Sequence, residues 1–156
     1  MRNRSVGYQP IDLADPTKRS AFLDRVVGSA TKVLIITEGL LGYLDSEVVR
    51  SIGQDLLGRP AVRWWLLDVA SPAILKMMQR GMGENLANAP LKFAPADGVA
   101  FFETLGWKAC DIREIFQEAV RFRRVPFFFR LFALLPQPDP RKPGKARWSA
   151  VVRFGR

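Results

Sequence analysis

The chain has 156 residues, 48% of them hydrophobic, and its 24 Lys and Arg against 15 Asp and Glu give a formal charge of +9 at pH 7. This length suits one domain, residues 1–156, with a hydrophobic core. The sequence has no histidine and one cysteine, which excludes Ser-His-Asp and Cys-His catalysis, the usual zinc sites and an internal disulfide. We expect Cys110 to be a buried small side chain, and any chemistry to use carboxylates, hydroxyls, backbone amides or a bound cofactor.

The sequence contains no apolar stretch near the roughly 20 residues needed to span a bilayer. Its basic N-terminus, residues 1–5, is not followed by the apolar run of a signal peptide. A single cysteine also suits a reducing compartment. We therefore expect a cytoplasmic protein.

The first third of the chain alternates short apolar runs with amphipathic segments. Residues 6–9 are a candidate strand, and Asp15 followed by Pro16 is typical of the start of a helix, which we expect to end at Gly28. The run 33–37 predicts a buried parallel strand. A second helix follows from Asp45 or Ser46, with Gly58 and Pro60 as its stop signals. The expected apolar faces are Phe22, Leu23 and Val26 in the first helix and Val48, Val49, Ile52 and Leu56 in the second.

The alternation continues through the middle of the chain. Residues 62–69 predict a strong strand, and Ser71-Pro72 begins a helix to about Arg80 with Ile74, Leu75 and Met78 inward.

A further short helix begins at Asp97 and carries Phe101, Phe102 and Leu105. A strand at 107–110, a helical or irregular stretch 111–135, a proline-rich loop 136–145 and a last strand 146–154 complete the chain. This order of strands and helices is typical of crossover units in a parallel sheet, so we expect an α/β fold.

Three motifs occur in a specific order: IDLAD at 11–15, TEGLLGYL at 37–44 and FETLGW at 102–107. Together they resemble the leucine carboxyl methyltransferase-like family of S-adenosylmethionine-dependent methyltransferases. The resemblance implies a class I, Rossmann-like sheet of strand order 3-2-1-4-5-7-6, with 6–9 as strand 3 and 33–37 as strand 4.

Strands 1 and 2 and the glycine turn that would hold the donor have no sequence here. We therefore expect a partial sheet and a weak or inactive isolated chain. The apolar edge at 33–36 would pair with another chain, as a homodimer or with a missing N-terminal half.

The resemblance places Asp12, Leu13, Glu38 and Gly39 at S-adenosylmethionine. Asp12 would accept a hydrogen bond from the adenine amine, Leu13 would pack on the ring, and Glu38 would lie beside the donor. The residues alone leave alternatives open, because Asp12 can form an Asx turn and Glu38 can be a surface carboxylate. The apolar neighbours of Glu38 nevertheless predict its partial burial. Asp15 is expected to act as a helix cap.

On the acceptor side, Tyr43 is either a hydroxyl near the substrate or an interfacial aromatic, and Asp68 ends a strand and could face the same crevice. The family often has a larger side chain at Gly42, so the acceptor side is expected to be roomier here. The implied reaction is methyl transfer to a carboxyl or hydroxyl oxygen. No metal is required, and no catalytic residue is assigned, although a hydroxyl acceptor would need Glu38 or Asp68 as a base.

The alternative function is a binding module that uses the segment 121–130. This segment interleaves arginines with phenylalanines, as binders of nucleic acid or anionic surfaces do. The same residues could instead be core aromatics beside a solvated basic face, or a lid that attracts an anionic substrate. We favour the core interpretation and do not expect a nucleic-acid partner, because no nucleic-acid motif accompanies the segment.

Overall fold

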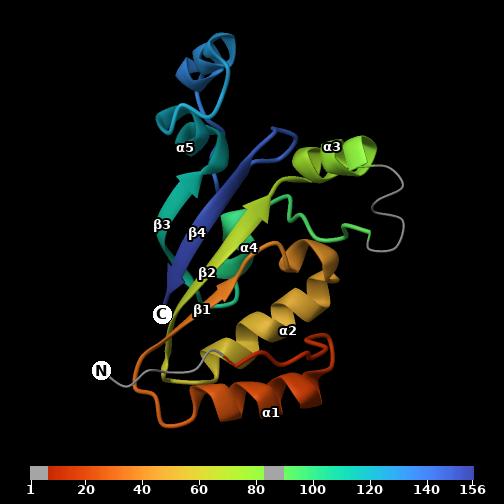
Figure 1. The fold of residues 1–156 in the computed structure, drawn as a ribbon, viewed down its shortest axis with the longest axis vertical. Helices are drawn as coiled ribbons and strands as arrows, with labels where there is room; N and C mark the ends of the chain where they lie inside the picture. The colour runs from red at the N-terminus through yellow and green to blue at the C-terminus, as the bar shows by residue number, and fades with distance from the viewer. Residues whose placement is uncertain (1–6, 83–89) are drawn as a thin grey trace.

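The computed structural model describes residues 7–82 and 90–156, and Figure 1 shows the arrangement of its helices and strands. The elements in chain order are α1 (Pro16–Val27), β1 (Val33–Thr37), η1 (Leu41–Tyr43), α2 (Ser46–Leu57), β2 (Val62–Ala70), α3 (Pro72–Met82), α4 (Val99–Glu103), β3 (Lys108–Glu114), α5 (Ile115–Arg121), η3 (Phe127–Leu134) and β4 (Ser149–Gly155). None of the helices among the described residues is long and apolar enough to cross a membrane.

The four strands form one sheet of order β1-β2-β4-β3. β1 is parallel to β2, and β4 is antiparallel to both of its neighbours, so β3 runs in the direction of β2. This order and these directions match the 4-5-7-6 half of the sheet that the motifs predicted. The α/β class and the partial Rossmann-like sheet are therefore confirmed, and β1 lies at the edge where strand 1 would pair.

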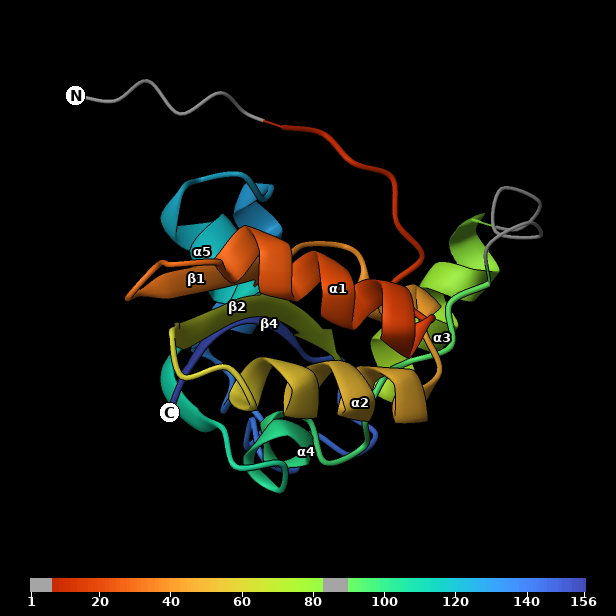
Figure 2. The ribbon, with the colours of Figure 1, turned by 90° about the horizontal axis from the view of Figure 1, so that it is seen from below.

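The two faces of the sheet are covered unequally. Figure 2 shows α2 and α4 on the same side of the sheet, and on that side Trp65 and Leu67 of β2 are buried. On the opposite face Leu34 and Ile36 of β1 remain 47% and 59% exposed. The prediction that 33–37 is a buried strand is therefore wrong, because β1 is an edge strand with one face open.

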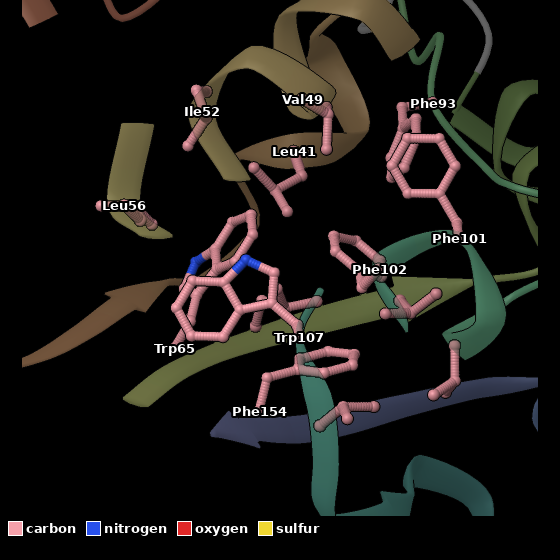
Figure 3. Close-up of a cluster of buried hydrophobic side chains, with 14 of the residues drawn as sticks. Leu41, Val49, Ile52, Leu56, Trp65, Phe93, Phe101, Phe102, Trp107 and Phe154 are labelled. Carbon is pink, nitrogen blue, oxygen red and sulfur yellow. The ribbon is translucent and has the colours of Figure 1, made fainter. Parts of the chain in front are cut away.

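The core between the sheet and α2 is built around two tryptophans, as Figure 3 shows. The Trp65 ring lies 5.5 Å from the Phe102 ring and 5.6 Å from the Trp107 ring, measured between centroids. A buried indole N–H is usually hydrogen-bonded. Here the Trp65 indole donates to Thr37 Oγ1 at 3.0 Å, and the Trp107 indole donates to the Gly53 carbonyl at 3.2 Å. These bonds tie β2 to the end of β1, and the residue that precedes β3 to α2.

A buried arginine joins α1 to α2. Arg19 is 1% exposed and its guanidinium donates to Asp55 Oδ2 at 2.7 Å, to Ser51 Oγ at 2.6 Å and to the Leu13 carbonyl at 2.6 Å. Arg59 adds a more exposed pair with Asp24 at 2.7 Å. The loop that precedes α1 is thus held against α2 through Leu13.

Several local predictions differ from the structure. Gly7–Gln9 forms no strand, and Val6 lies outside the described residues. Val26 is 51% exposed because it lines, with Leu34 and Ile36, the open cavity between α1 and the edge of β1. Met78 is 37% exposed because α3 extends past the end of the sheet. Cys110 is also exposed, since β3 forms the other edge of the sheet and its pairing with β4 is irregular around this residue.

Three element boundaries also differ. β3 begins one residue later than predicted and continues through 111–114, a stretch expected to be helical or irregular. β4 begins at Ser149 rather than at 146. α4 begins at Val99, because Gly98 takes a positive φ of 50° immediately before it.

Candidate functional site

The carboxyl ends of β1 and β2 lie side by side and bring two of the predicted residues together. Asp68, near the end of β2, accepts a hydrogen bond from the backbone N–H of Gly39 at 2.8 Å through Oδ1. Gly39 has a φ of 59°, a conformation that favours glycine. The Asp68 carboxylate therefore stabilises the turn that follows β1 and determines where Glu38 is placed.

Glu38 and Asp68 line a common cavity of about 240 Å³ on the open face of the sheet. The remaining lining is apolar and comes from Ile36, Leu66 and Val151 of three adjacent strands, with Thr37 and Leu67. Glu38 is exposed, so the prediction that it is partly buried is wrong. Its carboxylate makes no hydrogen bond or ion pair within residues 7–82 and 90–156, which leaves both oxygens available to a ligand.

Asp12 and Leu13 occupy the loop before α1. Asp12 Oδ1 accepts from the Ala14 N–H at 2.9 Å, so the Asx turn that the sequence allowed is present. Asp12 also lines an open cavity beside Lys18 and Arg25, whereas the half-buried Leu13 lines a second, apolar cavity between α1 and the β1 edge. Asp12 and Glu38 are thus exposed carboxylates that line different cavities.

Asp15 is the helix cap that the sequence predicted. Its Oδ1 accepts from the N–H groups of Lys18 and Thr17 at 3.1 and 3.0 Å. The bond from the Lys18 amide is the largest cause that lowers the pKa of the Asp15 carboxyl, because it favours the charged form.

Tyr43 lies in η1 and is 40% exposed, outside the lining of the Glu38 cavity. The preceding Gly42 carbonyl accepts from the N–H groups of Lys92 and Phe93 at 2.7 and 3.1 Å. A Cβ on Gly42 would lie 3.2 Å from Leu91 Cδ2. The roomier acceptor side expected at Gly42 is therefore not found, since Leu91 occupies that space.

A larger cavity that the sequence did not predict lies at the carboxyl ends of β2 and β3. It measures about 540 Å³ and is lined by Ile74 and Met77 of α3, Glu114, Phe116, residues 135–138, and Arg147, Trp148 and Ser149 at the start of β4. The volume is typical of small-molecule sites, and the lining is mainly apolar with a few polar groups. Glu114 Oε1 accepts from the Trp148 indole N–H at 3.1 Å, which orients the carboxylate at the cavity wall.

Sequence reasoning missed this cavity because its parts are distant along the chain. The prolines at 136 and 138 were recognised only as loop formers, and Arg147 and Trp148 were assigned to a strand. In the structure, 71–74 follow β2, 114–116 lie at the end of β3 and 147–149 lie at the start of β4, but the sequence signalled only the first and the last of these, because the strand at 107–110 was expected to end before residue 111. Such segments meet at one end of a sheet when the strands pair in the observed order.

Comparison with known proteins gives matches among solved structures but none among family models or curated proteins. No family model matches the chain, and a search of curated proteins finds no match. The fold is similar to magnesium protoporphyrin IX methyltransferase from Synechocystis PCC 6803, a crystal structure with bound SAH, at a TM-score of 0.47 and 11% identity. The alignment covers 95% of this chain and 50% of that one, so the chain spans about half the length of that methyltransferase.

Proposed function

We propose that this chain is part of an S-adenosylmethionine-dependent O-methyltransferase, with the donor at the carboxyl ends of β1 and β2. The observation that carries the proposal is the Glu38–Gly39–Asp68 arrangement in a sheet of order β1-β2-β4-β3. Open α/β sheets bind ligands at the carboxyl ends of their strands. The three sequence motifs support the same assignment independently of the sheet.

The described residues fit one side of such a donor. Glu38 offers two free carboxylate oxygens to hydroxyl groups, and Gly39 allows close approach of a ligand because nothing lies within 4 Å of the position of a Cβ. Asp12 retains one oxygen for an amine, and the half-buried Leu13 offers an apolar surface to a ring. We assign these four residues to the donor and Tyr43 and Asp68 to the acceptor side.

The reaction requires alignment more than acid-base chemistry. Bound S-adenosylmethionine supplies an electrophilic methyl group on a sulfonium centre. A carboxylate acceptor is already ionised at neutral pH and needs no base. For a hydroxyl acceptor, Asp68 or Glu38 would take the proton, since both carboxylates line the same cavity.

The 540 Å³ cavity is the place that we assign to the body of the acceptor. Its apolar walls, from α3 and residues 135–138, suit a hydrophobic or aromatic molecule. Glu114 and the exposed Arg147 can orient polar groups of that molecule. β4 connects the two cavities, because Ser149 lines one and Val151 lines the other.

The open edge of β1 suggests how the donor site is completed. β1 pairs only with β2 among the described residues, and an apolar edge strand favours pairing with further strands. We propose that a strand from another polypeptide, either a second copy or a separate segment, pairs there and supplies the remaining donor contacts.

Isothermal titration with S-adenosylhomocysteine, together with the mass in solution, tests this assignment. We expect binding that Glu38→Gln weakens by tenfold or more, about 1.4 kcal/mol. Glu47→Gln is the matched control, because Glu47 is an exposed carboxylate on α2, outside the Glu38 cavity. Equal affinities of the Glu38→Gln and Glu47→Gln variants would contradict the role of Glu38, and a folded protein that binds no donor would refute the function for this chain alone.

A further inference from the structure

The segment 121–135 projects beyond the end of the sheet. Figure 1 shows α5 and η3 past the carboxyl end of β3, away from α1 and α2. No residue of α5 is buried. One link between α5 and η3 is the bond from Gln117 Nε2 to the Ala133 carbonyl at 3.1 Å.

Large apolar side chains of this segment are unusually exposed. Their exposed fractions lie between 57% and 81% for Phe122, Phe127, Leu131, Leu134 and Leu135. The interpretation that the aromatics of 121–130 belong to the core is therefore wrong for Phe122 and Phe127. Concentrated apolar exposure of this kind marks a surface that contacts another apolar phase or molecule.

The same segment is strongly basic. Residues 121–135 include four arginines and no acidic residue. Arg121 pairs with Glu118 at 3.3 Å, and its guanidinium lies 5.7 Å from the centre of the Phe122 ring. The exposed Arg123 and Arg124 have no carboxylate partner within the described part of the chain.

We propose that residues 121–135 form a binding surface for anionic lipid membranes. Insertion of phenylalanine and leucine side chains at the headgroup boundary removes apolar area from water, while arginines beside them attract anionic headgroups. Arginine side chains can keep their charge at the headgroups while their stems lie along apolar surface.

The aliphatic residues favour a membrane over a nucleic acid. Base stacking uses aromatic rings, and it gives no role to exposed leucines at 131, 134 and 135. A lipid surface accounts for the leucines, the phenylalanines and the arginines together.

The test is co-sedimentation of the whole chain with vesicles of phosphatidylcholine alone and of phosphatidylcholine mixed with phosphatidylserine. We expect binding to the mixed vesicles only, weakened by salt. Removing both charges in R123Q/R124Q should lower the affinity about 25-fold, since one surface arginine contributes about fivefold. Removing apolar contacts in F127S/L131S/L134S should lower it more than about tenfold.

Matched controls remove the same kinds of side chain elsewhere on the chain, and so distinguish binding by residues 121–135 from binding by any exposed arginine or apolar side chain. R63Q/R80Q removes two exposed arginines elsewhere, and Y8S/V26S/M78S removes three exposed apolar side chains elsewhere. Both controls should bind as the parent chain does. Binding that falls equally in controls and test variants, or no binding to anionic vesicles, would overturn the proposal. The proposal would also be overturned if the chain did not bind vesicles but bound single-stranded oligonucleotides in a salt-sensitive way, and if R123Q/R124Q abolished that binding.

Discussion

Replacement of Asp55 by alanine should leave the Arg19 guanidinium buried without a counter-charge. Arg19 is fully buried, and Asp55 accepts from its Nε at 2.7 Å. Breaking a buried ion pair by removing one partner costs about 3–5 kcal/mol. Because the Asp55 side chain is itself 31% exposed, water can reach the vacated site, and we expect the lower end, about 3 kcal/mol.

Urea denaturation followed by circular dichroism measures this loss as a change in the free energy of unfolding. Adding R19M to D55A should restore about 1–2 kcal/mol, because the unpaired charge is then replaced by an apolar side chain of similar length. D45A is the control: it breaks the exposed pair with Lys92 at 3.0 Å and should cost less than about 1 kcal/mol. The reasoning is refuted if D55A costs no more than D45A, or if the double variant is no more stable than D55A.

Three further predictions concern the backbone and its caps. Gly98→Ala should destabilise the protein by more than about 2 kcal/mol in the same urea assay, because a Cβ would lie 2.4 Å from the Pro140 carbonyl oxygen. Gly39→Ala is the comparison: nothing lies within 4 Å of the position of its Cβ, so the positive φ alone should cost about 1 kcal/mol. Ser71→Ala should cost about 2 kcal/mol of stability, since the buried Ser71 hydroxyl donates to the Ala146 carbonyl at 2.6 Å and accepts from the Trp148 backbone N–H at 3.2 Å. A loss of stability below about 0.5 kcal/mol would contradict this prediction. The folded-state pKa of Asp15 is lowered, so the stabilisation by this carboxylate is present above the ordinary pKa of an aspartate and is lost as pH falls through the folded pKa. Thermal melts should therefore show Asp15→Ala less stable than the parent at pH 7 and equal to it in strong acid.

Local signals predicted most of the helices and strands. Asp15 and Pro16 begin α1 and Gly28 ends it, because a cap and a positive-φ glycine act within a few residues of themselves. The runs 33–37 and 62–69 form β1 and β2, because a short apolar run is also a signal that neighbouring residues carry. The order β1-β2-β4-β3 agreed with the motifs, although no single strand encodes its neighbours.

The candidate site was predicted only in part. Glu38 and Asp68 were each suspected because they follow or end strands. Their common cavity and the bond from Gly39 to Asp68 depend on the register of β1 against β2. The Arg19 contact to Leu13 was missed, because it joins residues of α1, α2 and a loop that no periodicity relates.

The sequence by itself determined where the chain turns, which segments alternate in polarity and which carboxylates follow strands, since these depend on neighbouring residues. Tertiary structure alone decided burial. Ile36 and Trp65 are both apolar strand residues, yet the first is 59% exposed and the second fully buried. Only Trp65 lies under α2, while Ile36 lies on an open face of an edge strand. Burial depends on which elements pack against a face, a property of the whole fold that no local pattern contains.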